Sequence, residues 1–348
     1  MKILWYDITF SNFKIYYPSF LLALNRKTDL LLVADENYEE NKLYLKENSL
    51  KFKRSSLLTS NRVIANDFQP SLIITHAQRI PDMLLFAYAK KNGIKTIMLQ
   101  HGMYNGFLKR ENKLFFKKIS KTIKYLIFGI QISRELKDHR AFLFLINAFI
   151  RGKSKISQYS KCRFMNAEKV FVYGEMWKDY HSKEFGYLDT EQVVIGYNKL
   201  KEIRISPKKN QYQYIAQTLV EDGRMSLKDF TNILLKLKNN YGLFCVKLHP
   251  RSNPNIYLKL GLTNLTHELC DSEVYIGHYS SVLGVLMKLN RIVHIWQIKG
   301  HEIPDYFLSN CSETFPNLNE DFQGSSWSID SYFSDYLGDE KLLNLIVK

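Results

Sequence analysis

The sequence predicts an α/β protein built from two parallel-sheet domains, and three observations support this class. The chain has 348 residues, more than a single hydrophobic core usually organises. Short apolar runs alternate with helical stretches, which is typical of parallel strands joined by crossover helices. A polar stretch with one proline, residues 205–211, separates two such series and resembles a linker. We therefore expect domains at 1–204 and 205–348.

The first domain is expected to begin with a strand at the N-terminus and to continue with alternating strands and helices. Its strands are predicted at residues 2–9, 29–35, 71–76, 94–102, 167–175 and 191–197. A helix is expected at 81–93, because Pro81 stands in its first turn and Gly93 at its end.

The second domain repeats this alternation. Strands are predicted at 211–219, 243–250, 271–279 and 291–296, and helices at 225–242 and 281–290. Ser226 is expected to cap the first of these helices. A last helix at 339–348 is able to pack on either domain.

The net charge of +15 is concentrated in one segment. Residues 107–155 hold 13 basic and three acidic residues, and apolar positions 115, 119, 123, 126 and 130 share one helical stripe. This pattern predicts a basic amphipathic helix that lies on an anionic membrane surface. A core helix with a solvated basic face is the ordinary alternative. Nucleic-acid binding is not expected, because no recognition motif accompanies the charge.

The cysteines indicate a cytoplasmic protein, and the basic segment 107–155 predicts that it is peripheral on the inner face of the cell membrane. The four cysteines are scattered without a CxxC pair, so they are expected to be reduced thiols and not zinc ligands. Neither a signal peptide nor an apolar run long enough for a membrane span is recognisable.

Three polar clusters follow strands of the second domain. Glu221-Asp222-Gly223, His249-Pro250 and Ser280-Ser281 each stand at the end of a predicted strand, and one strand–helix unit separates each cluster from the next. Ligands of open parallel sheets bind beyond the carboxyl ends of the strands. We expect the clusters to lie side by side on one sheet edge.

Together these residue types suit transfer of a group from a phosphate-bearing donor to an alcohol. A carboxylate of Glu221 or Asp222 can accept the proton of an attacking hydroxyl, and Gly223 permits a sharp turn. His249 can donate to a phosphate oxygen, on a turn fixed by Pro250. Ser280 and Ser281 open a helix, whose N-terminus suits an anion. Each cluster alone is an ordinary turn or cap, and only their joint occurrence indicates a site.

The ordered motifs QTLVEDG (217–223), VKLHP (246–250) and YSS (279–281) resemble those of bacterial sialyltransferases and polysialyltransferases. This resemblance implies a GT-B fold, in which two Rossmann-like domains face a central cleft. It implies an inverting, metal-independent transfer of a nonulosonic acid from a CMP donor to a glycan, lipid-linked or free, in capsule, O-antigen or lipopolysaccharide synthesis. Glu221 is implied as the base, His249 as the acid or phosphate partner, and Ser280 and Ser281 as phosphate ligands. No cofactor is implied.

Further residues are candidates at lower weight. His101, Gly102 and Tyr104 end a strand of the first domain and are expected to contact the acceptor. Lys247 and His278 are expected near the donor, although a solvated lysine and a packed histidine are the ordinary alternatives. Arg251 flanks His249 and could balance the donor charge, with a solvated side chain as the ordinary alternative. His76 is a weaker candidate at another strand end. The sequence Asp271-Ser272-Glu273 is the closest approach to a metal-binding DxD motif, and we interpret it as a surface turn.

Rival functions remain open. Within the enzyme class they are a CDP-polyol phosphotransferase, a Kdo transferase of related fold, and a sugar-nucleotide epimerase of the same architecture. From a different class comes a basic protein that binds membrane or nucleic acid without catalysis.

Overall fold

A computed structural model of the chain describes most of its residues. They are 1–35, 41–56, 60–103, 126–127, 129–131, 133–134, 137, 139, 142, 165–201, 203–299, 303–315 and 327–347. These residues form two compact units. Unit 1 takes its described residues from Met1–His101, Leu114–Lys199 and Ser334–Lys348, and unit 2 takes them from Gly102–Lys113 and Leu200–Phe333.

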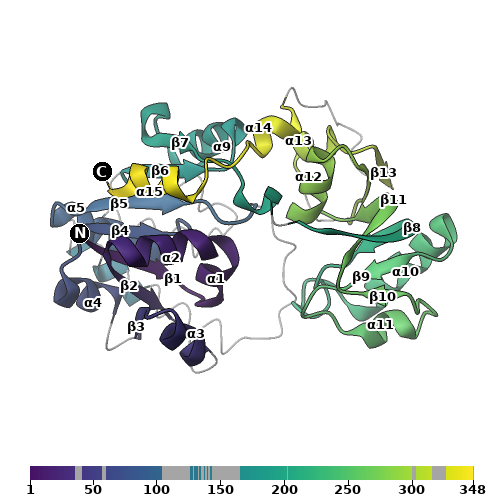
Figure 1. Cartoon of the computed structure of the whole chain (residues 1–348), viewed down its shortest axis with the longest axis horizontal. Coiled ribbons are helices and arrows are strands. Elements are labelled where there is room, and N and C mark those ends of the chain that lie inside the picture. The colour runs from purple at the N-terminus through teal and green to yellow at the C-terminus, as the bar shows by residue number, and fades with distance from the viewer. Residues whose placement is uncertain are drawn as a thin grey trace. The chain divides into compact units, whose positions relative to one another are not determined.

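Unit 1 contains a seven-stranded parallel sheet in the order β3-β2-β1-β4-β5-β6-β7 (Figure 1). Its strands are β1 (Lys2–Asp7), β2 (Asp29–Ala34), β3 (Lys51–Arg54), β4 (Leu72–Thr75), β5 (Lys95–Leu99), β6 (Lys169–Val172) and β7 (Gln192–Val194). The strand β3, with sequence KFKR, was not predicted because it is polar and mostly exposed at the sheet edge.

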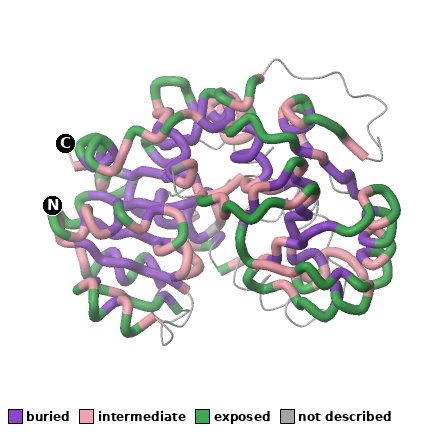
Figure 2. Tube along the Cα trace, turned by 45° about the vertical axis from the view of Figure 1, so that its right-hand side comes forward, coloured by how far each residue is buried: buried purple, intermediate pink, exposed green. Residues whose placement is uncertain are grey.

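Helices pack on this sheet because its central strands are apolar on both faces. They are α1 (Ser11–Tyr16), α2 (Pro18–Lys27), α3 (Lys42–Glu47), α4 (Asn61–Phe68), α5 (Ile80–Lys91) and α9 (Glu175–Phe185). Leu4 and Tyr6 of β1 pack with α4 and α5, whereas Trp5 meets Phe13 and Phe20 edge-on at 5.7 and 5.8 Å. Figure 2 shows the buried residues running along the strands.

The C-terminal segment belongs to unit 1, whereas the sequence-based division assigned it to the second domain. Ser334 N–H donates to the carbonyl of Tyr173, and the carbonyl of Ser334 accepts from Tyr197. The last helix, α15 (Asp339–Val347), packs beside α2 (Figure 1). The sequence did not show on which domain this helix packs, because an amphipathic pattern indicates that one face is buried but does not identify the partner.

Unit 2 contains a six-stranded parallel sheet in the order β10-β9-β8-β11-β12-β13. Its strands are β8 (Ile205–Ile215), β9 (Cys245–Lys247), β10 (Leu265–Thr266), β11 (Leu269–Gly277), β12 (Ile292–Trp296) and β13 (Glu313–Phe315). Its helices are α10 (Leu227–Tyr241), α11 (Pro254–Leu258), α12 (Ser281–Lys288), α13 (Asp305–Leu308) and α14 (Ile329–Tyr332). When the strands of each sheet are numbered in chain order, the first six lie in the Rossmann order 3-2-1-4-5-6. The predicted fold class, α/β with two Rossmann-like parallel sheets as in GT-B, is confirmed.

The linker predicted at 205–211 is wrong, because these residues form the first half of β8. That half pairs with β11 only, since β9 begins to pair at Gln213. The register slips between Ser206 and Lys209, so Pro207 lies where β8 has two unpaired residues. A proline is tolerated in a strand at such an irregularity, because no ladder hydrogen bond is required of it there.

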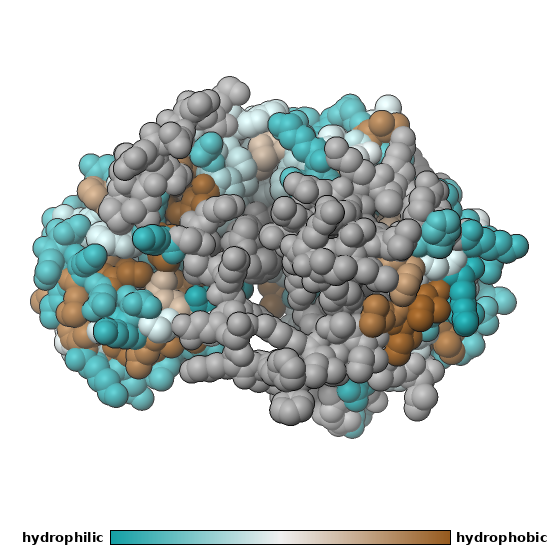
Figure 3. Space-filling model, turned by 180° about the vertical axis from the view of Figure 1, so that it is seen from behind, coloured by the Kyte–Doolittle hydropathy of each residue, from teal (hydrophilic) through white to brown (hydrophobic). Residues whose placement is uncertain are grey.

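The basic segment 107–155 lies almost wholly outside the described residues. Of its predicted apolar stripe, Leu126 and Ile130 are described and helical. Leu126 is half-buried and Ile130 is 44% exposed, while Ile127, outside the stripe, is 40% exposed. No described helix is long and apolar enough to cross a membrane. In the view of Figure 3, the described surface carries apolar patches (brown) among hydrophilic residues (teal).

Candidate functional site

The three predicted motifs of unit 2 follow three neighbouring strands. Glu221-Asp222-Gly223 comes after β8, His249-Pro250 after β9 and Ser280-Ser281 after β11. In the sheet β8 lies between β9 and β11, and all three strands are parallel. The expectation that these motifs share one sheet edge is therefore confirmed. The edge includes the switch point between β8 and β11, where ligands of such sheets bind.

Asp222 connects the loops after β8 and β9. Its Oδ1 accepts a hydrogen bond of 2.7 Å from Arg251 Nη1, and its Oδ2 accepts one of 2.9 Å from Thr218. Arg251 also reaches Thr218 at 3.2 Å. Partial burial would raise the pKa of Asp222, but the hydrogen bonds from Arg251 and Thr218 and the guanidinium charge lower it. Asp222 is thus a poor proton acceptor that holds two motif loops together.

Glu221 is more available. Its side chain is exposed, and Oε1 accepts a 2.7 Å hydrogen bond from the backbone N–H of Asn253. Its Oε2 has no hydrogen-bond partner among the described residues. The chain turns after it at Gly223, whose φ of +63° lies in the left-handed region that favours glycine. Of the two carboxylates, Glu221 is the one placed to accept a proton.

His249 follows β9 with a defined tautomer. Its Nδ1 accepts a 3.2 Å hydrogen bond from the backbone N–H of Arg251, so the proton of the neutral ring is on Nε2. Burial and the charges of Arg251 and Lys247 lower the pKa of His249. Burial also lowers the pKa of Lys247, the last residue of β9, while Pro250 is exposed in the following turn. His249 is therefore a neutral hydrogen-bond donor.

Ser280 and Ser281 begin α12. Ser280 is the N-cap, and its Oγ accepts from the N–H of Leu283 at 3.4 Å. The loop before them is tied to the loop after β8, because Gln217 Nε2 donates to the carbonyl of Tyr279 at 2.5 Å. A helix N-terminus with two hydroxyls thus faces the same edge as the other motifs, and its N–H groups suit an anion.

His278 has a different place from the one predicted. Its side chain is completely buried, and Nδ1 donates to the carbonyl of Trp296 at 2.8 Å. Its Nε2 accepts from the hydroxyl of Tyr214 at 2.9 Å. Both ring nitrogens are occupied inside unit 2, so His278 is placed to support the end of β11.

Of the candidates of the first half, His76 and His101 lie in unit 1, and Gly102 is the first residue of unit 2. His101 follows β5, and its Nδ1 donates to the carbonyl of His76 at 2.6 Å. Burial and the neighbouring His76 lower the pKa of His101 to about 4. Gly102 has a φ of +63° and provides a turn directly after it. Tyr104 lies outside the described residues.

Sequence reasoning missed partners that lie far away along the chain. Arg251 is exposed, as expected, but its ion pair with Asp222 was not foreseen. Asp7 was not singled out, although it is fully buried and bonded to His76. A charged residue that ends an apolar strand, as in KILWYD, is the signal that would have identified it.

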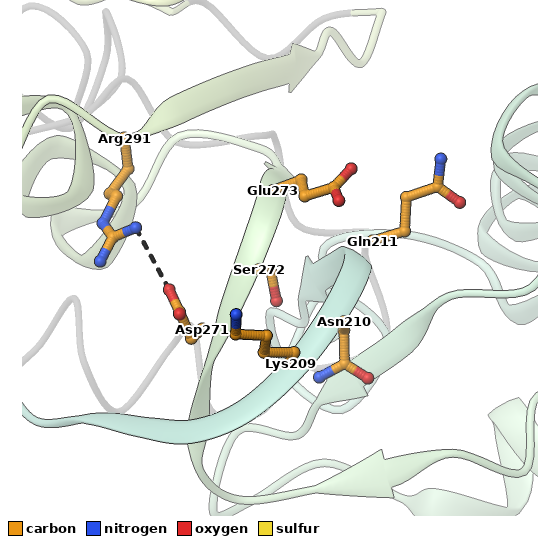
Figure 4. A pocket seen from close by; sticks show the side chains of 7 residues that line it. All are labelled: Lys209, Asn210, Gln211, Asp271, Ser272, Glu273 and Arg291. Carbon is orange, nitrogen blue, oxygen red and sulfur yellow. Dashed lines mark ion pairs between the residues drawn. The ribbon is translucent and has the colours of Figure 1, made fainter.

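A polar pocket of about 430 Å³ lies elsewhere in unit 2, along β8 and β11 and away from the carboxyl edge. Figure 4 shows its lining residues, which are Lys209, Asn210, Gln211, Asp271, Ser272, Glu273 and Arg291. Asp271 pairs with Arg291 at 3.2 Å. The prediction that 271–273 form a surface turn is wrong, because they lie within β11 and Ser272 is buried. The described residues contain no group of three or more His, Cys, Asp or Glu arranged to hold a metal ion.

Comparisons with known proteins give structural similarity without sequence similarity. No family model and no curated protein matches the chain. A UDP-GlcNAc 2-epimerase from Neisseria meningitidis is similar at 14% identity and a TM-score of 0.43, covering 85% of this chain and 82% of that one. A glycosyltransferase from Rickettsia africae has 12% identity, a TM-score of 0.43 and coverages of 86% and 80%. The wall teichoic acid polymerase TagF has 11% identity, a TM-score of 0.42 and coverages of 86% and 72%. At these identities and TM-scores the similarity indicates no activity for this chain.

Proposed function

We propose that this protein is an inverting, metal-independent glycosyltransferase. It moves sialic acid or a related nonulosonic acid from a CMP donor to a glycan hydroxyl in bacterial surface polysaccharide synthesis. The observation that supports this most is the meeting of a carboxylate, a neutral histidine and a serine-capped helix at the carboxyl ends of β8, β9 and β11.

In the proposed step the acceptor oxygen attacks the anomeric carbon of the donor sugar. A bond forms between these two atoms while the bond from the anomeric carbon to the CMP phosphate oxygen breaks. The electron pair of the broken bond stays on the phosphate, and the hydroxyl proton goes to Glu221. Asp222 holds the loop of Glu221 against the loop of His249 through Arg251.

The donor phosphate is proposed to lie at the N-terminus of α12. Ser280 and Ser281 offer hydroxyl and N–H donors there, and His249 offers its Nε2 proton. Because the CMP phosphate leaves already ionised, a hydrogen bond from a neutral histidine suffices. Lys247 balances the donor charge, Gly223 and Pro250 shape the two turns, and His278 supports the strand end.

The acceptor is proposed to be a glycan, lipid-linked or free, contacted by His101, Gly102 and Tyr104. The basic segment 107–155 is proposed to hold the protein on the inner face of the cell membrane. No nucleic acid is expected as a partner, and the sugar nucleotide is a substrate, so no cofactor is proposed.

A panel of donors tests this function. The protein is incubated with a glycan acceptor and one donor, which is CMP-N-acetylneuraminic acid, CMP-Kdo, CDP-glycerol or UDP-N-acetylglucosamine. Release of the nucleotide is measured with and without EDTA. We expect release of CMP from the sialic acid donor, unchanged by EDTA. Preference for CDP-glycerol or CMP-Kdo would replace the proposal by the corresponding rival, and turnover of the UDP sugar would indicate a hexose transferase or an epimerase.

A further inference from the structure

The sheet of unit 1 has its own switch point, between β1 and β4. Ligands of open parallel sheets bind in the crevice outside the strand ends at such a point. Asp7 ends β1 and His76 directly follows β4. Both side chains are fully buried, and His76 Nδ1 donates to Asp7 Oδ2 at 2.8 Å. A buried aspartate–histidine pair therefore spans the place where the fold favours a ligand.

Asp7 is held in its charged form. Its Oδ1 accepts from the N–H of Thr9 at 3.0 Å, from Asn12 at 2.9 Å and from Arg79 at 3.3 Å. Burial alone would raise the pKa of Asp7, but the hydrogen bond from His76 and the charge of Arg79 lower it well below its usual range. Because the carboxylate of Asp7 accepts the Nδ1 proton of His76, Nε2 is the ring nitrogen that this pair leaves over. His76 Nε2 is buried without a hydrogen-bond partner among the described residues.

His76 in turn holds His101, which follows the next strand of the sheet. The carbonyl of His76 accepts the Nδ1 proton of His101 at 2.6 Å, and the two rings lie 5.7 Å apart. This bond assigns the lone pair of the neutral His101 ring to Nε2. Burial lowers the pKa of His101 to about 4, so the ring is neutral at physiological pH. The series of hydrogen bonds from Asp7 through His76 to His101 therefore leaves His101 Nε2 as a hydrogen-bond acceptor.

The surroundings of His101 select a neutral ligand that donates hydrogen bonds. Arg79 lies near the rings and pairs with Asp82 at 2.8 Å, so charges of both signs surround them. The half-buried ring of Tyr16 packs edge-on against the ring of His101, with 5.0 Å between the ring centroids. Lys199 Nζ lies over the Tyr16 ring, 5.2 Å from its centroid. Because Arg79 and Lys199 offset the carboxylates, neither a cation nor an anion is favoured there. An aromatic surface with a few placed polar atoms suits a sugar.

We propose that Asp7, His76 and His101 form a hydroxyl-binding site at the switch point of unit 1, in which His101 Nε2 accepts a hydrogen bond from a sugar hydroxyl. Asp7 and His76 are positioning residues that fix the ring and the backbone to which His101 is bonded. The inference rests on the proposed function, because the ligand is the class of molecule that would serve as acceptor.

The tautomers are tested first, by ¹⁵N NMR of the histidine rings in the full chain without ligand. We expect Nδ1 protonated and Nε2 unprotonated in His101. His181 is an internal reference, because it is buried in α9 and its Nδ1 donates to the carbonyl of Trp177 at 2.7 Å. Asp7→Asn is expected to mix the tautomers of His76 and to leave His181 unchanged. A His101 ring protonated on Nε2 in the unmodified protein would overturn the proposal.

Binding is tested by titrating the same protein with methyl β-D-galactoside, methyl β-D-glucoside and inorganic phosphate. We expect the glycosides to shift the His101 Nε2 signal and phosphate to leave it in place. Loss of one hydrogen bond in His101→Gln should weaken the glycoside by about 3–10-fold, and Asp7→Asn should weaken it in the same direction. The control His181→Gln should bind as the unmodified protein does.

Three outcomes contradict the inference. They are no glycoside-dependent shift at His101, a shift with phosphate alone, and equal binding by His101→Gln and His181→Gln. The tautomer measurement and the glycoside titration need no nucleotide. A failure of the proposed function would instead appear as no nucleotide release from any donor, so the two failures can be told apart. The tautomer and the glycoside titration are read in the unmodified protein, so they hold even where a variant does not fold.

Discussion

Glu221 and Asp222 are adjacent carboxylates with different surroundings. Asp222 is engaged by Arg251 and Thr218, whereas Glu221 accepts one backbone N–H and is exposed. We expect Glu221→Gln to lower kcat by about 10²–10⁴-fold, the usual effect of removing a general base. His249→Ala should fall in the same range.

The matched change is Asp222→Asn, which keeps the shape of the side chain and removes its charge. It should lower kcat less than Glu221→Gln does, because it loosens the loops without removing the base. The measurement is the rate of CMP release at saturating CMP-sialic acid. A larger loss in Asp222→Asn would exchange the roles of the two carboxylates, and near-normal turnover in Glu221→Gln would end the assignment.

His181 predicts a dependence of stability on pH. Burial lowers its pKa to about 4 in the folded protein, while the unfolded chain has about 6.5. Between these values the unfolded chain binds more protons, so the free energy of unfolding falls as the pH falls from 6.5 and levels off below 4. The contribution of His181 makes the free energy of unfolding about 2 kcal/mol lower at pH 5.0 than at pH 7.5. Urea titrations at pH 5.0 and pH 7.5 give the difference in the free energy of unfolding between the two pH values. This difference should be about 2 kcal/mol smaller in His181→Gln than in the unmodified protein. An unchanged difference would contradict the burial of a neutral ring.

At the scale of residues, sequence patterns identified the motif positions but not their partners. The order of Glu221, His249 and Ser280 along the chain predicts a common edge, because one strand–helix unit separates each motif from the next. The bond of Asp222 to Arg251, 29 residues away, and that of Asp7 to His76, 69 residues away, depend on loop geometry that no local pattern encodes. The bonds of His278 to Trp296 and Tyr214 were not foreseen for the same reason, since both partners are remote in sequence.

At the scale of elements, apolar strands were predictable and polar ones were not. The runs that form β1, β2 and β4 are buried on both faces and therefore read as continuous apolar stretches. The first half of β8 is polar because β9 does not pair with it, and it was mistaken for a linker. The hydrophobic pattern of a sequence depends on burial. Strands that are paired in a sheet but exposed to solvent therefore cannot be predicted from it.

The docking of the C-terminal segment depends on one glycine. Gly196 has a φ of +77°, and a Cβ there would lie 2.1 Å from the carbonyl oxygen of Asp335. We expect Gly196→Ala to destabilise unit 1 by about 2–4 kcal/mol, from backbone strain and displacement of the segment. Gly93→Ala is the matched control, because Gly93 has a φ of +64° and open space around it.

Urea unfolding of the two variants separates strain from contact. Gly93→Ala should cost about 1–2 kcal/mol, the strain alone. Equal losses in both variants would mean that the backbone of Asp335 does not press on Gly196 in solution. Amide exchange of α15 should also rise in Gly196→Ala only.

At the scale of the whole molecule, the basic segment predicts association with anionic membranes. Lys117, Lys118, Lys121 and Lys124 are each expected to add about 1 kcal/mol of attraction near such a surface. Changing all four to Gln should weaken co-sedimentation with phosphatidylserine-containing liposomes by at least about tenfold. The control changes four exposed lysines elsewhere, Lys90, Lys228, Lys236 and Lys259, and so has the same net charge. Equal binding by the two variants would leave net charge, and not this segment, as the cause.

The central claim is that unit 2 binds a CMP-linked donor at the carboxyl edge of its sheet. Its most direct test is a thermal shift of the protein with CMP, CDP, UDP and GDP, each with and without EDTA. A ligand at 100 times its Kd stabilises the folded state by about 2.7 kcal/mol, which is readily measured. We expect stabilisation by CMP above the other nucleotides, unchanged by EDTA and lost in a Ser280→Ala/His249→Ala variant. Stabilisation by another nucleotide instead of CMP, or by none, would contradict the account.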